Sequence, residues 1–264
     1  MPTDTIKRER LMSEIPLLQE NICREIREQG FTKLATKDLC NLLGDTLPSA
    51  FTQHWNALHT SWAHLHRDAH LKDGGAYRQR RHSCFVQDID AHSLIQTPHR
   101  AHWQPTVFNA LHGGYDRMFE AIEPSVAQDT EFLKLISALG ETFAHLHTAR
   151  RWYIEAHQFR INTNGGIGRP TPEGAHRDGV DFVVVMMLGR HNVKGGETRV
   201  FNVDDSSGVR FVMQEPYTTI LLNDERVIHE TTPIQPEQPG MSDCWRDTLV
   251  LTYRARGFQS PEAM

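Results

Sequence analysis

The sequence has few cysteines, no long apolar run and no dense block of one charge sign, and each absence excludes a class of protein. Its four cysteines are scattered without CxxC spacing, which argues against a disulfide scaffold and for free thiols. No apolar run approaches the roughly 20 residues of a membrane span. The net charge is −5 and basic stretches are short, so a nucleic-acid or membrane-surface partner is not indicated. We expect a small-molecule partner.

The beginning of the chain is charged and lacks the apolar stretch of a signal peptide. Together with the free thiols, this leads us to expect a cytoplasmic protein. The 264 residues, 39% of them hydrophobic, suffice for one large core. Nothing in the sequence indicates the oligomeric state.

The apolar spacing changes at about residue 150. Before it, apolar residues recur every three or four positions, which predicts helices at about 11–30, 37–43, 48–70 and 131–147. Gly30 is expected to end the first of these helices, and Pro16 either kinks it or marks its true start. Residues 1–150 are therefore predicted to form a mostly helical region that packs on the rest of the protein.

From residue 151 onward the pattern is typical of strands. At least seven short apolar or alternating runs are separated by turns such as NGG, KGG, DDSSG and QPEQPG. Many short strands with tight turns favour an antiparallel barrel or jelly roll. The predicted fold is a mainly β core, a cupin-like double-stranded β-helix formed by residues 151–264 and braced by α-helices, with both parts in one integrated domain.

The stretch GAHRDGVDFVVVMMLG, residues 174–189, places His176 and Asp178 at the entrance of an apolar run. In a β-strand, residues i and i+2 point to the same side about 6 to 7 Å apart, so both side chains can bind one ion. The same tripeptide at 66–68 lies in a predicted helix, where i and i+2 point about 200° apart. We therefore expect residues 66 and 68 on a solvated helix surface and retain only His176 and Asp178 as candidate metal ligands.

A third metal ligand is offered by His229, which lies in a second strand pattern 53 residues after His176. Two histidines and one carboxylate on one face, with about three positions open, form the facial arrangement of non-haem Fe(II) oxygenases. With 16 histidines in the chain, such a motif also arises by chance. The order of elements supports it, because a double-stranded β-helix brings both ends of the motif to one site.

A candidate anion clamp follows at the start of the last predicted strand. Arg246 and Thr248 share a face there, 17 residues past His229. A guanidinium fork beside a hydroxyl suits the distal carboxylate of a dicarboxylate co-substrate. Arg254 and Arg256 compete for this role, and a surface position is the alternative for Arg246.

Three stretches, PEGAHRDGVDFVVVMMLGRHNVKGGETRVF, VIHETTPI and RDTLVLTY, resemble the bacterial 2-oxoglutarate-Fe(II) dioxygenases that hydroxylate free L-amino acids. Isoleucine dioxygenase and the stress- and biofilm-associated homologues belong to that group. The resemblance covers residues 150–257 and, weakly, 77–85, whereas no motif matches in the first 75 residues.

The resemblance implies His176, Asp178 and His229 as iron ligands, Arg246 as the 2-oxoglutarate anchor and Thr248 as its companion. It also implies Fe(II) as cofactor, with 2-oxoglutarate and O2 as co-substrates. The implied reaction hydroxylates an unactivated C–H bond and releases succinate and CO2, with no catalytic residue beyond the metal site. Aliphatic or cyclic amino acids, such as isoleucine, leucine or pipecolic acid, are the first expected substrates, although a carrier-bound or peptidyl substrate is an alternative.

The strand pattern HQFRINTN offers candidate substrate contacts. Gln158, Arg160 and Asn162 alternate onto one face, opposite His157 and Phe159. If the polar face lines the barrel interior, Gln158 and Arg160 contact the substrate, and Arg160 pairs with its α-carboxylate. If the apolar face lies inside, Arg160 is a surface residue.

Two other functions fit a barrel of this kind. A cupin-like metal enzyme that does not use 2-oxoglutarate has no need of Arg246 and more often presents an all-histidine site. A non-catalytic barrel module would bind a small metabolite and carry a vestigial metal triad. The complete triad in this sequence argues against the second alternative.

Overall fold

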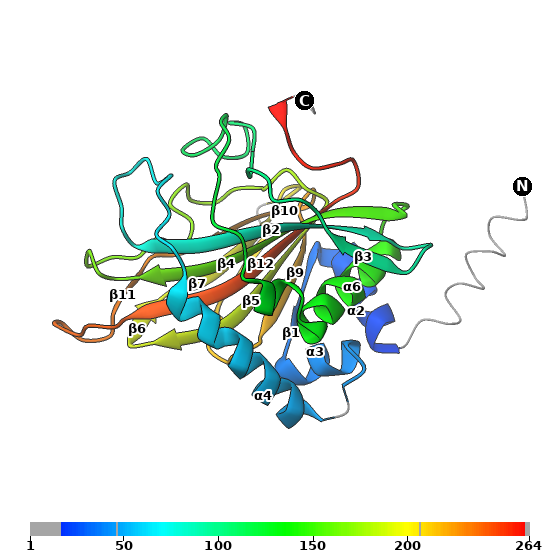
Figure 1. Cartoon of the computed structure of the whole chain (residues 1–264), viewed down its shortest axis with the longest axis horizontal. Coiled ribbons are helices and arrows are strands. Elements are labelled where there is room, and N and C mark those ends of the chain that lie inside the picture. The colour runs from blue at the N-terminus through cyan, green and yellow to red at the C-terminus, as the bar shows by residue number, and fades with distance from the viewer. Residues whose placement is uncertain (1–16, 46, 206, 262–264) are drawn as a thin grey trace, which may run out of the picture.

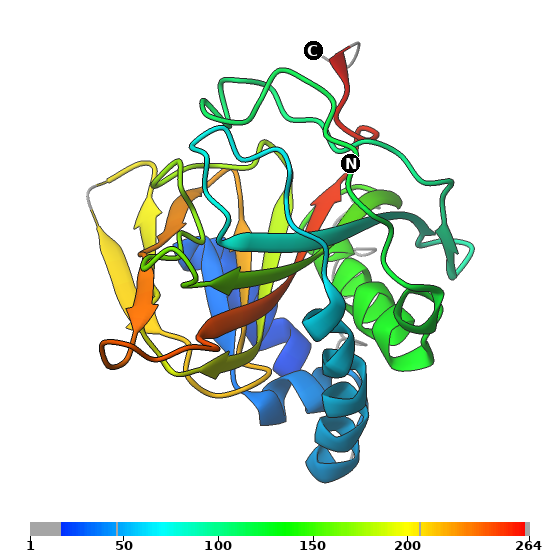
Figure 2. The ribbon, with the colours of Figure 1, turned by 60° about the vertical axis from the view of Figure 1, so that its left-hand side comes forward.

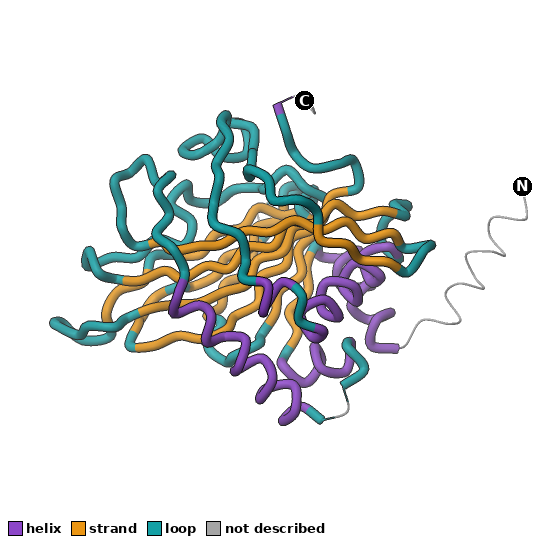
Figure 3. The backbone as a smooth tube through the Cα atoms, in the orientation of Figure 1, coloured by secondary structure: helices purple, strands orange, loops and turns teal. Residues whose placement is uncertain are grey.

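The computed structural model describes residues 17–45, 47–205 and 207–261. Its helices gather on one side of a large twisted sheet, and long loops lie on the opposite side (Figures 1 and 3). The helices are α2 (Leu17–Gln29), α3 (Thr36–Leu42), α4 (Pro48–His59), the 3-10 helix η1 (Thr60–His64), α5 (Pro124–Ala127) and α6 (Thr130–Ala144). The strands are β1 (Phe31–Leu34), β2 (Arg78–Asp88), β3 (Ser93–Gln96), β4 (Arg151–Asn162), β5 (Phe182–His191), β6 (Val193–Gly195), β7 (Glu197–Asn202), β8 (Gly208–Val212), β9 (Thr219–Asn223), β10 (Val227–Thr231), β11 (Ile234–Pro236) and β12 (Trp245–Arg254).

The strands form one large and one small antiparallel layer. The large sheet has the order β1-β9-β5-β12-β4-β2-β3, and the small layer consists of β10-β7-β8 and the pair β11-β6. From β5 onward the chain passes repeatedly between the layers, with β5, β9 and β12 in the large sheet and β7 and β10 in the small one. Figure 2 shows the small sheet, in yellow and orange, on the side away from α4 and α6. This winding confirms the predicted double-stranded β-helix.

The region before residue 150 contributes strands as well as helices. β1, β2 and β3 all belong to the large sheet, and β2 pairs with β4 along its whole length. The sequence pattern of β2 hid its nature, because its positions 78, 80 and 82 carry Arg78, Arg80 and His82 in place of apolar residues, and the two arginines line the cavity. The division of the chain at residue 150 stays a prediction.

Most predicted helices are present with shifted ends. α2 ends before Gly30, which has a φ of +83° and donates its N–H to Ile26 O at 3.0 Å, as the C-cap prediction requires. The predicted residues 11–16 lie outside the described part. The helix predicted for 48–70 is too long, because α4 and η1 end at His64. Among the described residues, no helix is both long and apolar enough to cross a membrane.

The core has two main parts on either side of the large sheet. Between this sheet and the helices, Trp55, Trp62 and Trp152 are fully buried in the larger cluster. Between the two sheets, a smaller apolar cluster contains Val183 and Val200. The remaining inner face of β2, β4 and β12 lines a cavity with many polar side chains. The candidate metal ligands line the same cavity from the side of the small sheet.

Candidate metal centre

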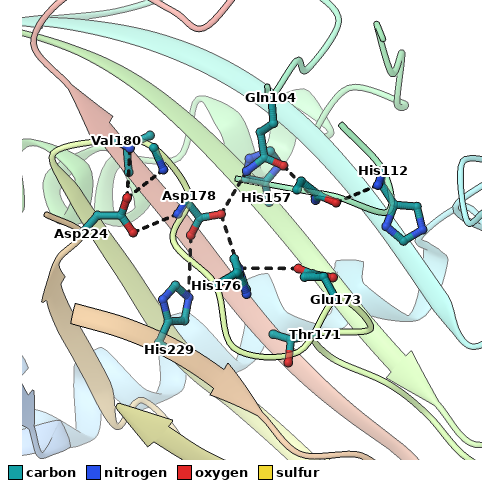
Figure 4. A network of polar contacts seen from close by, with 12 residues as sticks. Gln104, His112, His157, Thr171, Glu173, His176, Asp178, Val180, Asp224 and His229 are labelled. Atoms are coloured by element: carbon teal, nitrogen blue, oxygen red, sulfur yellow. Dashed lines mark hydrogen bonds and ion pairs between the residues drawn. The ribbon is translucent and has the colours of Figure 1, made fainter. Parts of the chain in front are cut away.

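Three predicted ligands meet at the mouth of the small sheet. His229 lies on β10 and pairs with His176 through two backbone hydrogen bonds of 3.0 Å. Asp178 faces both rings, with Oδ1 3.7 Å from His176 Nε2 and Oδ2 3.7 Å from His229 Nε2 (Figure 4). The candidate ligand atoms of the three residues all lie within 4.8 Å of one another. The structure therefore brings together the two histidines and the carboxylate that the sequence spacing suggested.

The pair His176 and Asp178 precedes the apolar strand and does not lie within it. β5 begins only at Phe182, and His176 makes an isolated bridge to β10. The two side chains nevertheless share a side, as residues i and i+2 do in extended backbone. The metal-binding pair is therefore carried by a loop fixed at one point to the small sheet.

Asp224 holds this loop in place, and the sequence analysis did not find it. Its carboxylate, which is fully buried, accepts hydrogen bonds from the backbone N–H groups of Asp178, Gly179 and Val180 at 2.9, 2.7 and 3.1 Å (Figure 4). Burial and the nearby charge of Asp178 raise the pKa of Asp224 to about 7. Gly179 has a φ of +76°, and a Cβ atom there would stand 2.3 Å from the ring of Phe108. The loop conformation thus depends on a long-range contact and a glycine.

The histidine rings are oriented for ligation through Nε2. His176 Nδ1 donates to Gly174 O at 3.0 Å, which leaves Nε2 facing Asp178. Burial favours neutral rings, but the hydrogen bond and charge of Asp178 outweigh it and raise the pKa of His176 to about 10. Burial and the neighbouring His176 lower the pKa of His229 to about 4. Despite the cost of burial, the two histidines hold the pKa of Asp178 well below its usual range.

A chain of side-chain hydrogen bonds through Gln104 also positions Asp178. Gln104 Nε2 donates to Asp178 Oδ1 at 3.1 Å, while Gln104 Oε1 accepts from Arg117 Nη2 at 2.8 Å and from Asn109 Nδ2 at 3.2 Å. Figure 4 shows Gln104 and His229 approaching Asp178 from different directions. Because Arg117 and Asn109 both donate to Oε1, the amide oxygen of Gln104 must face them, and its NH2 group must face Asp178. No local sequence signal marks this residue, because its partners lie far along the chain.

Arg246 and Thr248 line the same cavity from β12, as predicted. Both are 3% exposed. The Nε and Nη2 atoms of Arg246 are buried without a hydrogen-bond partner among the described residues. Burial and the charge of Arg190 lower the pKa of Arg246 to about 9. A buried guanidinium with such donors is the group that an anionic carboxylate satisfies, so this position can bind an anion. The competing Arg254 also lines the cavity, but it donates to Gly257 O at 2.9 Å.

Gln158 and Arg160 lie on the opposite face of β4, so the prediction of substrate contacts through them is corrected. Arg160 donates to both carboxylate oxygens of Asp247, at 2.8 and 2.6 Å, and its guanidinium lies over Trp245. Gln158 donates to Ser61 Oγ at 3.0 Å on the helical side of the sheet. Gln158 therefore joins β4 to η1, and Arg160 joins β4 to β12.

The cavity-facing side of β4 carries Glu155 and His157, which approach His82 on β2 and His102 in a loop. All four residues are buried, and their possible ligand atoms also lie within 4.8 Å of one another. The i, i+2 spacing of Glu155 and His157 was a readable signal for this second cluster. The sequence analysis assigned His157 to the face opposite the candidate contacts, and that face lines the cavity.

Comparison with known proteins gives one family and several solved structures. The family described as 2OG-Fe dioxygenase matches residues 59–252. A bsmA homologue from Methylobium petroleophilum PM1 is 50% identical with a TM-score of 0.86, over 94% of this chain and 97% of its own. IDO from Bacillus thuringiensis is 18% identical with a TM-score of 0.71, over 90% of this chain and 99% of its own. The Fe(II)/(alpha)ketoglutarate-dependent dioxygenase TqaL is 19% identical with a TM-score of 0.68, over 90% and 87%. The last two likenesses show the fold alone, and no curated protein matches the chain significantly.

Proposed function

Because the chain belongs to the 2OG-Fe dioxygenase family, we propose that it hydroxylates an unactivated C–H bond of a free L-amino acid and releases succinate and CO2. Family membership implies Fe(II) as the metal, with 2-oxoglutarate and O2 as co-substrates. The choice of an amino acid is supported by the sequence resemblance to amino-acid hydroxylases and by a cavity that carries both cationic and anionic side chains. Isoleucine, leucine and pipecolic acid are the first candidates.

In this proposal His176, Asp178 and His229 hold the iron. Two imidazoles and one carboxylate are the ligands that such a site needs, and they leave about three positions open. A bound metal would take the place of the proton that Asp178 favours on His176. When bound, iron supplies with 2-oxoglutarate and O2 the oxidising power for the C–H bond. The chain supplies the orientation: Gly174 O fixes the His176 ring, and Gln104 and Asp224 fix Asp178 and its loop.

Arg246 and Thr248 bind the distal carboxylate of 2-oxoglutarate in this proposal. The observation that carries it is that the metal triad faces one cavity with Arg246, whose Nε and Nη2 have no partner among the described residues. A cupin-like enzyme that does not use 2-oxoglutarate would leave this buried cation without a ligand, at the cost of an unsatisfied charged group.

The test measures succinate from protein loaded with Fe(II) anaerobically and then given 2-oxoglutarate and O2. A panel of free L-amino acids and cyclic analogues is screened, with mass spectrometry for a product one oxygen heavier. We expect at least one amino acid to give matched succinate and hydroxylated product. Succinate at the uncoupled background for every panel member, despite bound iron, would contradict the proposal and favour a tethered substrate or a non-catalytic module.

A further inference from the structure

A second group of histidines and a carboxylate stands on the cavity wall beside the metal centre. His82, His102, Glu155 and His157 are all buried, and the last three line the cavity. His102 Nδ1 lies 2.5 Å from Glu155 Oε2, while His157 Nε2 lies 3.7 Å and His82 Nε2 3.8 Å from the same oxygen. By composition alone this group resembles a second metal site.

The hydrogen bond from Arg80 argues against a metal in this group. A guanidinium only donates, so the 2.8 Å contact of Arg80 Nη2 makes His157 Nδ1 an acceptor. The neutral ring then carries its proton on Nε2, the atom that faces Glu155, and a protonated nitrogen does not ligate a metal. Arg80 is held in place between the rings of Phe119 and Phe159, at 3.7 and 4.6 Å from their centroids. His157 therefore presents a protonated nitrogen to Glu155 and not a nitrogen that could ligate a metal.

Glu155 keeps one oxygen free. Oε2 accepts the proton of His102 Nδ1, whereas Oε1 is buried without a partner among the described residues. Burial raises the pKa of Glu155, but the nearby His157 and His82 outweigh it and hold the pKa below its ordinary value. Burial lowers the pKa values of His102 and His157 well below the usual range, so these rings are neutral. A buried carboxylate with an oxygen that lacks a partner among the described residues is a strong acceptor for a cationic donor.

Arg117 offers the complementary charge on the same wall. It is 2% exposed, and its Nε atom has no hydrogen-bond partner in the part of the chain that the structure describes. Its backbone exchanges hydrogen bonds of 3.0 and 2.9 Å with His102, the residue that contacts Glu155. Through Gln104 its side chain is also joined to the metal ligand Asp178. The wall thus presents a carboxylate oxygen and a guanidinium donor next to the metal centre.

We propose that this wall binds the zwitterionic head of the substrate: Glu155 Oε1 accepts from the α-ammonium group, and Arg117 Nε donates to the α-carboxylate. The inference rests on the proposed amino-acid hydroxylase function and names the residues that select such a substrate. Because Gln104 ties Arg117 to Asp178, the head is held at a fixed place relative to the metal and the side chain of the substrate supplies the C–H bond.

The test varies the charge on the protein and on the ligand together. The probes are L-leucine and L-isoleucine with their α-hydroxy analogues, which lack the ammonium group. Binding is measured by calorimetry on anaerobic protein loaded with Mn(II) and 2-oxoglutarate, and kcat/KM is measured on the Fe(II) enzyme. We expect Glu155→Gln to weaken amino-acid binding about 100-fold and binding of the hydroxy acids less than about 3-fold, because only the former loses a buried charge pair. Glu120→Gln, the same change at an exposed position, should leave both unchanged.

Three results would overturn the inference. Equal losses for amino acids and hydroxy acids in Glu155→Gln would assign a structural role to Glu155. Wild-type protein that binds the hydroxy acids as tightly as the amino acids would do the same without any variant. Two metal equivalents per chain, one of them lost in Glu155→Gln, would restore the metal assignment. Failure of the proposed function is distinguishable, because it shows as wild-type protein that turns over no free amino acid.

Discussion

The tripeptide His-Arg-Asp occurs twice in the chain, and its two copies have different roles. In the first copy Asp68 is 2% exposed and accepts from Arg78 Nε at 2.7 Å, while Arg80 lies 3.9 Å away. In the second copy Asp178 faces His176 and His229. Asp68 is buried and Asp178 is half-buried, so both carboxylates are partly or wholly shielded from water. The partners differ: guanidinium groups neutralise one carboxylate, and imidazoles that can ligate a metal surround the other.

The first copy also corrects a prediction. Residues 65–68 are not helical, and Asp68 is not on a solvated surface, although His66 is exposed. The backbone there pairs with β2, since Asp68 N donates to Arg78 O at 2.9 Å. The argument against a metal at this copy is therefore a different one: the carboxylate of Asp68 already pairs with Arg78 and Arg80. The comparison teaches that a buried carboxylate is assigned by its neighbours and not by its motif.

The largest contrast concerns turnover. Removing a ligand carboxylate with Asp178→Ala should abolish succinate formation, a loss of more than about 1,000-fold, because the metal loses one of three protein ligands. His66→Ala removes an exposed ring and should leave turnover nearly unchanged. Succinate release and bound iron are measured for both variants. Equal losses would break the comparison between the two copies.

The reverse contrast concerns stability. Asp68→Asn leaves Arg78 and Arg80 buried without their carboxylate and should lower the free energy of unfolding by about 3 to 5 kcal/mol. Although burial raises it, the two arginines hold the pKa of Asp68 below its ordinary value. Its stabilising effect is therefore present above the unfolded-state pKa, about 4, and is lost as the pH falls. Urea denaturation of metal-free wild type and variant at several pH values measures both effects; a variant as stable as wild type at pH 7 would refute the role of Asp68.

The third contrast concerns the support of Asp178. Asp224→Asn weakens the acceptor for three backbone N–H groups, so the ligand loop is less well fixed. We expect metal affinity to fall about 10- to 100-fold, the usual effect of altering a residue that positions a ligand. Asp204→Asn, the same change at an exposed position, is the matched control. Metal titration by competition with a chelator gives the affinities, and equal values for the two variants would contradict the role of Asp224.

Strong local patterns allowed the fold and the metal triad to be predicted. β5 and β12 carry apolar runs that predict strands. The metal site was predicted from the i, i+2 pair His176 and Asp178 together with His229 in a later strand pattern. β2 was missed, because Arg78, Arg80 and His82 interrupt its apolar alternation. A strand that lines a polar cavity does not follow the rule that polar residues face solvent.

The same effect explains the wrong face on β4. The polar residues Gln158 and Arg160 were candidates for the interior, yet they lie on the other face of β4, where Ser61 of η1 and Asp247 of β12 accept their hydrogen bonds. Asp224 and Gln104 were not predictable, because their partners are 46 and 74 residues away in the sequence. Contacts of this range depend on the folded topology and leave no local pattern.

The smallest contrast lies in the middle residue of each tripeptide. Arg177 is half-buried and donates from Nε to the backbone oxygen of Asp224 at 2.5 Å, whereas Arg67 is exposed and makes one contact of 3.5 Å to Gly75 O. Arg177→Ala should therefore lower the free energy of unfolding by about 1 kcal/mol, and Arg67→Ala should change it by less than about 0.5 kcal/mol. Denaturation midpoints of the two variants, measured side by side, test this order. The reverse order would mean that the turn at Asp224 does not depend on Arg177 and that Asp224 alone holds the ligand loop.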